Sequence, residues 1–314
     1  MNPIKFLFLV TFFSIFVVFY SLKKDSTSLP EGVEAISILG DSLRSGSSTL
    51  PEKLTLRIDS LINNANAKGE TTTALIWEAR LLGYNGEYRK AIELLTSELD
   101  EAEHLKRAEI LRHRGHRYIS IRKFEKAITD FEKASELIQS SEDIIEQDGL
   151  PNALNSPTSS LHTNIWYHLG LTYYLTGEFE KALYAYEQCI KASRNSDMLV
   201  AALYWQYMTL KRSGQDELAG KVLNNVNSEM DIIENDSYLK LLLIFKAEFD
   251  PQLILDEDSD ALSNATIGYG IGNWHFINGR KERARSIWQQ VYDGESWASF
   301  GYIASEAELA RLYE

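Results

Sequence analysis

Apolar residues recur every three to four positions along most of this chain, which is the spacing of one face of an α-helix. Such segments cover residues 33–43 and 54–67 and then run in pairs from 72 to 292, with another apolar helix over 238–248. The first two could form a degenerate helix pair. The alternation of apolar and polar residues that is typical of strands is nearly absent. The pattern therefore predicts an all-α fold.

Two of these stretches, 108–138 and 163–193, carry the same sequence pattern twice. The shared positions in the first are Leu111, Gly115, Tyr118, Phe124, Ala127, Phe131 and Ala134. Those of the second are Trp166, Leu169, Gly170, Tyr173, Gly177, Phe179, Ala182, Tyr186 and Cys189. This pattern resembles the tetratricopeptide repeat. The resemblance implies a right-handed superhelical solenoid of stacked antiparallel helix pairs, since one such pair cannot bury its apolar face alone.

The template divides residues 33–314 into repeats, one insertion and a closing helix. Clear repeats cover about 72–100, 108–139 and 163–193, and weaker ones cover 200–228 and 265–292. In the fourth repeat Tyr207 replaces the usual small residue, so either the helices separate there or the tyrosine turns into the groove. Residues 140–161 are an acidic insertion, expected to be a solvated, partly mobile loop. A capping helix over 296–312 is expected to present Glu306, Glu308 and Arg311 to water.

The first residues of the chain are predicted to lie outside the repeat fold. Residues 6–22 carry no charge, and as a helix they would rise about 25 Å, which is at the short end for a membrane span. No small-x-small cleavage site follows, so residues 1–24 are better explained as a signal anchor than as a cleaved signal peptide. Residues 25–32 would be a polar tether. We expect a single N-terminal membrane helix with the repeats extracytoplasmic, periplasmic or secreted if the signal is cleaved.

Composition narrows the range of functions. Hydrophobic residues make up 44% and charged residues 25% of the chain, as in ordinary folded proteins. The net charge of -13 argues against binding nucleic acid, which requires a cationic surface. A single cysteine, Cys189, excludes an intrachain disulfide framework and is expected to pack inertly.

The apparent chemical motifs of this sequence each lack a residue that the motif requires at its usual spacing. Gly268, Gly270 and Gly272 lack the third glycine and the strand of a dinucleotide loop. Residues 256–267 lack the turn glycine and closing glutamate of a calcium loop. His113, His116 and His168 could meet across two repeats, but no carboxylate completes a metal set by spacing. The sequence predicts a protein with no enzymatic activity, no metal and no cofactor.

The resemblance also implies which side chains line the concave face, namely inner positions of the first helix in each pair. Cations and tyrosines alternate at these positions, which suits an extended peptide bearing carboxylates or a free carboxy terminus. The candidate peptide-binding residues are Arg80, Tyr84, Arg112, His116, Asn164, Tyr167, Tyr174, Tyr204, Lys211, Arg212, Tyr269 and Asn273.

Three alternatives remain open at this point. The tyrosines could simply pack between helices while the arginines pair with nearby glutamates. The groove could capture a protein or peptide partner, making the chain a membrane-tethered or exported scaffold or adaptor. Alternatively, the insertion could fill the groove, and the chain would be a structural subunit of an envelope complex that assembles through its convex or terminal faces. No oligomeric state follows from the sequence.

Overall fold

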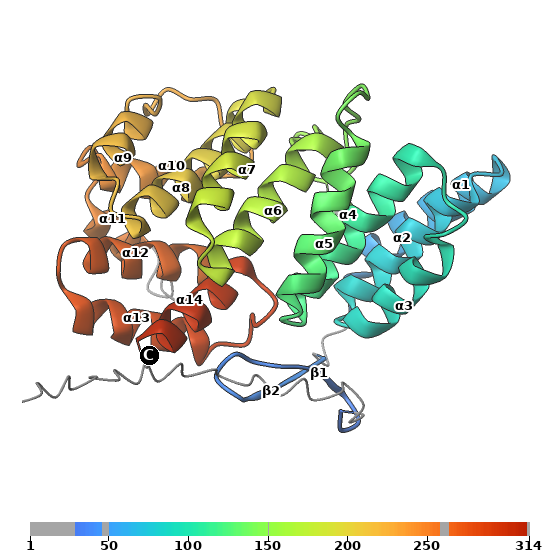
Figure 1. Ribbon diagram of the computed structural model, residues 1–314, viewed down its shortest axis with the longest axis horizontal. Helices are drawn as coiled ribbons and strands as arrows, with labels where there is room; N and C mark the ends of the chain where they lie inside the picture. Colours follow the sequence, from blue (N-terminus) through green and yellow to red (C-terminus); the bar gives the residue numbers. More distant parts are fainter. Residues whose placement is uncertain (1–28, 46–49, 150, 258–263, 313–314) are drawn as a thin grey trace, which may run out of the picture.

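The computed structural model describes residues 29–45, 50–149, 151–257 and 264–312. Within these ranges the chain is mostly helical, and the helices follow one another in a curved row whose last members turn back beneath its middle (Figure 1). The first seven helices are α1 (Glu52–Ala67), α2 (Thr71–Tyr84), α3 (Tyr88–Glu98), α4 (His104–Ser120), α5 (Phe124–Leu137), α6 (Leu161–Thr176) and α7 (Phe179–Ala192). They are followed by α8 (Ser196–Arg212), α9 (Asp216–Leu223), α10 (Asp236–Phe245), α11 (Pro251–Glu257), α12 (Ala265–Ile277), α13 (Lys281–Tyr292) and α14 (Phe300–Arg311).

The predicted helix pairs form because one small residue in the first helix receives one aromatic ring from the second. A Cβ atom at Gly115 would lie 2.8 Å from the Phe131 ring, and one at Gly170 would lie 2.8 Å from the Tyr186 ring. Both rings are fully buried. The late repeat does the same with Gly272 against Trp288 in α12 and α13. The same spacing of sixteen residues thus fixes the same close crossing in three repeats.

The fourth pair, α8 and α9, departs from this rule. Tyr207 is buried and stacks on Phe245 of α10, with ring centroids 4.9 Å apart. The sequence predicted that the helices separate at Tyr207 or that the tyrosine turns into the groove. Neither describes this arrangement fully, because the ring packs against α10, which lies outside the repeat. The additional helix α10 lies between α8 and α12 and continues the core across the break in the repeat pattern.

The predicted helix over residues 33–43 is wrong. Two short antiparallel strands, β1 (Val33–Ile36) and β2 (Ser42–Arg44), form a hairpin there. Gly40 adopts a φ of +100°, which closes the turn and which few residues other than glycine tolerate. The alternate burial of Val33 and Ala35 fits a strand period as well as a helix period over so short a segment. The chain is therefore predominantly helical rather than all-α.

The hairpin joins the two ends of the helical row. At one end, Arg89 of α3 donates a hydrogen bond of 2.7 Å from Nε to the Glu34 carbonyl oxygen. At the other, the Ser37 hydroxyl lies 2.8 Å from the Tyr292 hydroxyl of α13. Trp297, just before α14, donates from Nε1 to the Arg44 carbonyl oxygen at 2.8 Å. Segments that are more than two hundred residues apart in sequence are thereby held together (Figure 1).

The predicted membrane segment, residues 6–22, and the first half of the predicted tether, residues 25–28, lie outside the described residues. None of the helices within the described ranges combines the length and the apolarity that a membrane crossing requires.

Candidate functional site

The last helix occupies the inner face of the C-terminal repeats. Glu308 of α14 is only 1% exposed, and its carboxylate lies 2.9 Å from Nη1 of Arg212 on α8. It also accepts hydrogen bonds from the hydroxyls of Tyr174 on α6 and Tyr269 on α12, at 3.2 and 3.4 Å. The Arg311 guanidinium lies 3.1 Å from the same carboxylate. The helix therefore points its charged side inward, and its predicted exposure to water is wrong.

Glu306, two residues earlier in α14, is also buried, contrary to the prediction. Its side chain is fully buried and forms an ion pair with Arg122, just after α4, with an Nη2–Oε2 distance of 2.6 Å. The same carboxylate accepts a hydrogen bond from the backbone N–H of Ile38 in the hairpin. Because solvent cannot satisfy these groups, each carboxylate is paired within the protein. A helix on the outer surface would not need such pairing.

The predicted groove residues of the C-terminal half are consequently enclosed or neutralised. Tyr174, Tyr204, Tyr269 and Asn273 are buried. Lys211 pairs with Asp216 of α9. A pocket of about 220 Å³ remains beside Lys211, Arg212 and Asn273. Both of its cations are already paired with carboxylates, Lys211 with Asp216 and Arg212 with Glu308.

The insertion covers part of the N-terminal half. Glu146 forms an ion pair with Arg112, with 2.6 Å between Oε2 and Nη2, and it accepts a hydrogen bond of 2.6 Å from Nδ2 of Asn164. Arg80 donates from Nη1 to the Gln147 carbonyl oxygen at 2.8 Å. The insertion is thus held against the inner face by its own acidic and backbone oxygens, which differs from the expected solvated loop.

The start of α6 holds the other side of the insertion. The Asp143 carboxylate accepts hydrogen bonds from the Ser160 hydroxyl at 2.7 Å and from the His162 N–H at 3.0 Å. Ser160 and Thr163 form a capping box at the same helix end. These bonds satisfy N–H groups that the first turn of any helix leaves unpaired, so the acidic composition of the insertion has a structural use.

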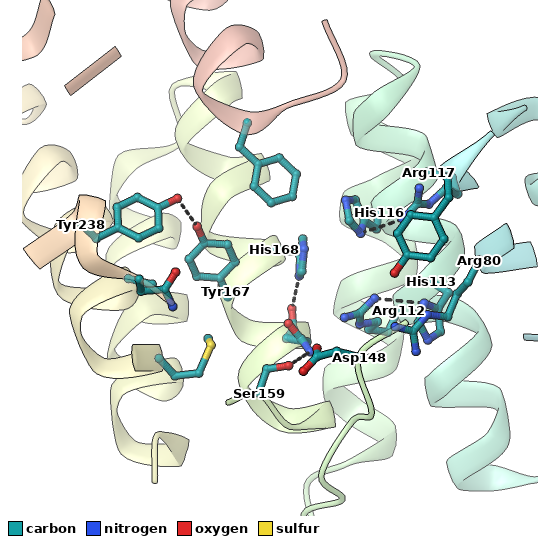
Figure 2. A pocket seen from close by; sticks show the side chains of 16 residues that line it. Arg80, Arg112, His113, His116, Arg117, Asp148, Ser159, Tyr167, His168 and Tyr238 are labelled. Carbon is teal, nitrogen blue, oxygen red and sulfur yellow. Dashed lines mark hydrogen bonds between the residues drawn. The ribbon is translucent and has the colours of Figure 1, made fainter. Parts of the chain in front are cut away.

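A pocket of about 380 Å³ remains between the insertion, the helices α2, α4, α6, α8 and α10, and the start of α14. Figure 2 shows the arginines with His113 and His116 on one side of it and Tyr167 with Tyr238 on the other, with His168 between. The described lining residues are Arg80, Tyr84, Arg112, His113, His116, Arg117, Asp148, Ser159, Asn164, Tyr167, His168, Met198, Ala201, Asn235, Tyr238 and Phe300. Hence the six predicted groove residues of the N-terminal half do converge on one site.

The arginines of this pocket differ in how they are paired. Arg112 forms an ion pair with Glu146. Within the described ranges, neither Arg80 nor Arg117 forms an ion pair with a carboxylate. Arg117 contacts Nδ1 of His116 at 3.2 Å and lies over the ring of Tyr88. Burial lowers the pKa of Arg117 to about 10. At neutral pH it therefore still carries its positive charge in a poorly solvated position.

The three histidines are kept neutral. Burial, with the nearby Arg112 as a further cause, lowers the pKa of His168 to about 3, and its Nδ1 contacts the Asn164 carbonyl oxygen. Burial and the arginines also lower the pKa of His113 and His116 well below the usual range. His116 and His168 stack with ring centroids 4.7 Å apart, and no group of three or more metal-ligating side chains occurs among the described residues.

Sequence reasoning missed Arg117, Asp148, Tyr238 and Phe300. Arg117 follows His113 by four residues and so shares its helix face, which was a usable signal. The others lie in the insertion, in α10 and at the start of α14, and no repeat template places these elements on the inner face.

Cys189 is free and fully buried, as predicted. Burial raises the pKa of its thiol to about 12, so the thiolate is scarce at neutral pH.

Comparison with known proteins identifies the repeat. The tetratricopeptide repeat family model matches residues 163–196, which include most of α6 and all of α7. A solved structure of nearly identical TPR-like repeats from Podosopora anserina is similar at 15% identity and a TM-score of 0.41, covering 69% of this chain and 92% of that one. A tetratricopeptide repeat protein from Parabacteroides merdae is similar at 16% identity and a TM-score of 0.44, covering 80% and 92% respectively. A search of curated proteins found no match.

The stacked pairs with their repeated glycine–aromatic crossings define a helical repeat protein. The family match falls on the most regular of these pairs, so residues 163–196 are similar to a tetratricopeptide repeat. Such repeats suggest a scaffold for interactions between proteins.

Proposed function

We propose that this chain is a non-enzymatic interaction scaffold that binds protein partners through its convex and terminal faces. The observation that carries this proposal is the occupied inner face: α14 covers the C-terminal half, and the insertion covers part of the N-terminal half. An extended peptide crossing several repeats would have to displace both segments. Each is held by ion pairs at buried or nearly buried positions, which are costly to break.

The described part of the chain has exposed apolar side chains outside the 380 Å³ pocket. Leu154 and Ile145 of the insertion are 70% and 69% exposed, and Tyr184 on α7 is 58% exposed. Tyr184 meets Trp166 of α6 edge to face, with centroids 6.0 Å apart. Aromatic and apolar groups of this kind are enriched in the cores of protein interfaces, which supports contact through surfaces outside the pocket.

Site-specific crosslinking tests this proposal, because the single native cysteine is buried and unreactive. Tyr184→Cys and Leu154→Cys place a thiol at exposed positions outside the pocket, and Tyr84→Cys places one at the pocket. Each variant is labelled with a photoreactive maleimide and irradiated in native cell extract or membranes. We expect defined protein adducts from positions 184 or 154 and none from position 84.

The opposite pattern would contradict the proposal. Adducts from Tyr84→Cys alone would favour capture of an acidic or carboxy-terminal peptide in the groove. The unsubstituted chain is the matched control and should remain unlabelled because Cys189 is inaccessible.

We further propose that residues 6–22 tether the scaffold to a membrane and that the repeats lie on its extracytoplasmic side. The uncharged apolar run with lysines on both flanks supports this proposal. The full chain should stay in the membrane pellet after alkaline carbonate extraction, while a chain starting at residue 25 should be released. Release of both chains from the membrane pellet would contradict this part of the proposal.

A further inference from the structure

We propose that the pocket binds a small organic anion, whose carboxylate or phosphate group contacts Arg80 and Arg117 while its uncharged ring lies against Tyr167 and Tyr238. This inference goes beyond the scaffold function and does not depend on it.

The first support is the excess of cationic groups over partners. Among the described residues, the guanidinium groups of Arg80, Arg112 and Arg117 face the pocket region against two carboxylates, Glu146 and Asp148. Nε of Arg112 is buried and has no hydrogen-bond partner within the described ranges. Arg112 and Arg117 are mostly buried, and a buried guanidinium group without full compensation costs free energy, so a site selected for stability alone would favour apolar side chains at these two positions. An anionic ligand supplies the missing acceptors.

Asp148 is the one carboxylate among the described lining residues. Its pKa is raised by burial and then by the nearby Glu234, and it is lowered less strongly by Arg80. The histidines contribute no positive charge while they are neutral. Three guanidinium groups against the carboxylates of Glu146 and Asp148 leave an excess of one positive charge among these groups, which suits a single anionic head rather than a polyanion.

The second support is the arrangement of the two walls. The arginines come from α2 and α4, whereas Tyr167 and Tyr238 come from α6 and α10 on the opposite side (Figure 2). The hydroxyls of Tyr167 and Tyr238 lie 3.0 Å apart and hold the two rings in place. The Phe300 ring lies 5.2 Å from the ring of His116 and 6.3 Å from that of Tyr167, measured between centroids. An aromatic ring lying against these side chains would contact their rings without burying a polar group of its own.

The third support is the size of the space and its boundaries. A volume of about 380 Å³ falls in the range of small-molecule sites and is too small for a folded partner. Phe300 of α14 bounds the pocket on one side, and Asp148 with Ser159 of the insertion bounds it on another. These segments shorten an open groove into a pocket, so the fold selects a compact ligand.

Calorimetric titration of the full chain tests the proposal with four probes: phenyl phosphate, benzoate, inorganic phosphate and benzyl alcohol. We expect phenyl phosphate or benzoate to bind more tightly than inorganic phosphate, and the neutral alcohol not to bind. The tighter of the two aromatic anions distinguishes a phosphate ligand from a carboxylate ligand. Arg117→Met and Arg80→Met should each weaken that probe at least about tenfold, as expected for loss of a charge-assisted hydrogen bond. Arg194→Met, at an exposed position, is the matched control and should bind normally.

Thermal unfolding separates a binding role from a structural one. If Arg117 binds a ligand, Arg117→Met without ligand should unfold at the same temperature as the unsubstituted protein or at a higher one. The probe should raise the unfolding temperature of the unsubstituted protein but not that of Arg117→Met. Absence of binding by both aromatic anions at millimolar concentration would overturn the proposal. Equal weakening by Arg194→Met, or binding of inorganic phosphate alone, would overturn it as well. Should Arg117→Met not fold, Arg80→Met at the pocket rim still decides the outcome.

Discussion

Glu308→Ala is expected to lower the free energy of unfolding by about 3–5 kcal/mol, because it removes one partner of a buried charge network. The carboxylate pairs with Arg212 and Arg311 and accepts from Tyr174 and Tyr269. After the substitution two guanidinium groups lose their counter-charge, and both hydroxyls lose an acceptor. Urea unfolding followed by far-UV circular dichroism would measure the loss as a shift of the transition midpoint.

A matched control distinguishes this effect from loss of an ordinary helix ion pair. Glu217 of α9 pairs with Lys221 one turn away, and its side chain is 85% exposed. Glu217→Ala should therefore change stability by only about 0.5 kcal/mol or less. If Glu308→Ala behaved like this control, α14 would not be docked on the inner face in solution.

Gly301→Ala is expected to destabilise the protein by about 3 kcal/mol, the upper end for overpacking a close contact. Gly301 lies in the first turn of α14, where a Cβ atom would be 2.1 Å from the carbonyl oxygen of Ala265 in α12. The obstacle is backbone, so no side chain can rotate to make room. The two helices would have to separate, and the inner tyrosines near Glu308 would be exposed.

The sign of the effect makes this prediction decisive. In a free helix, replacing glycine by alanine stabilises by up to about 1 kcal/mol. Gly220 of α9 is exposed, and a Cβ atom added there would have no neighbouring atom of the described chain within 4 Å, so Gly220→Ala should show that gain. Stabilisation by Gly301→Ala as well would mean that α14 does not cross α12 closely. Parallel measurement of the dye-binding fluorescence of each variant would report exposure of apolar surface.

The repeat core could be predicted from the sequence because its determinants are local and periodic. Gly115 with Phe131 and Gly170 with Tyr186 stand at one fixed separation, and the structure brings each pair into the contact that this separation implies. Cys189 likewise takes the buried small position that the template assigns.

The candidate site could be predicted only in part. Arg80, Arg112, Asn164 and Tyr167 meet at the pocket, as their shared inner positions suggest. The enclosure of Tyr174 and Tyr269 could not be predicted in the same way, because it depends on where a helix from the far end of the chain docks.

By itself, the sequence determined the stacked helix pairs, their order and the side that each first helix turns inward. These properties follow from hydrophobic period and from small residues opposite large ones, which act between neighbours in the chain. Only the tertiary structure decided that this inner side is filled. Glu306 and Glu308 read as solvent-facing charges on a last helix, yet they meet Arg122 and Arg212 from distant repeats. A carboxylate in water and a carboxylate opposite a buried arginine have the same sequence pattern, and only long-range packing selects between them.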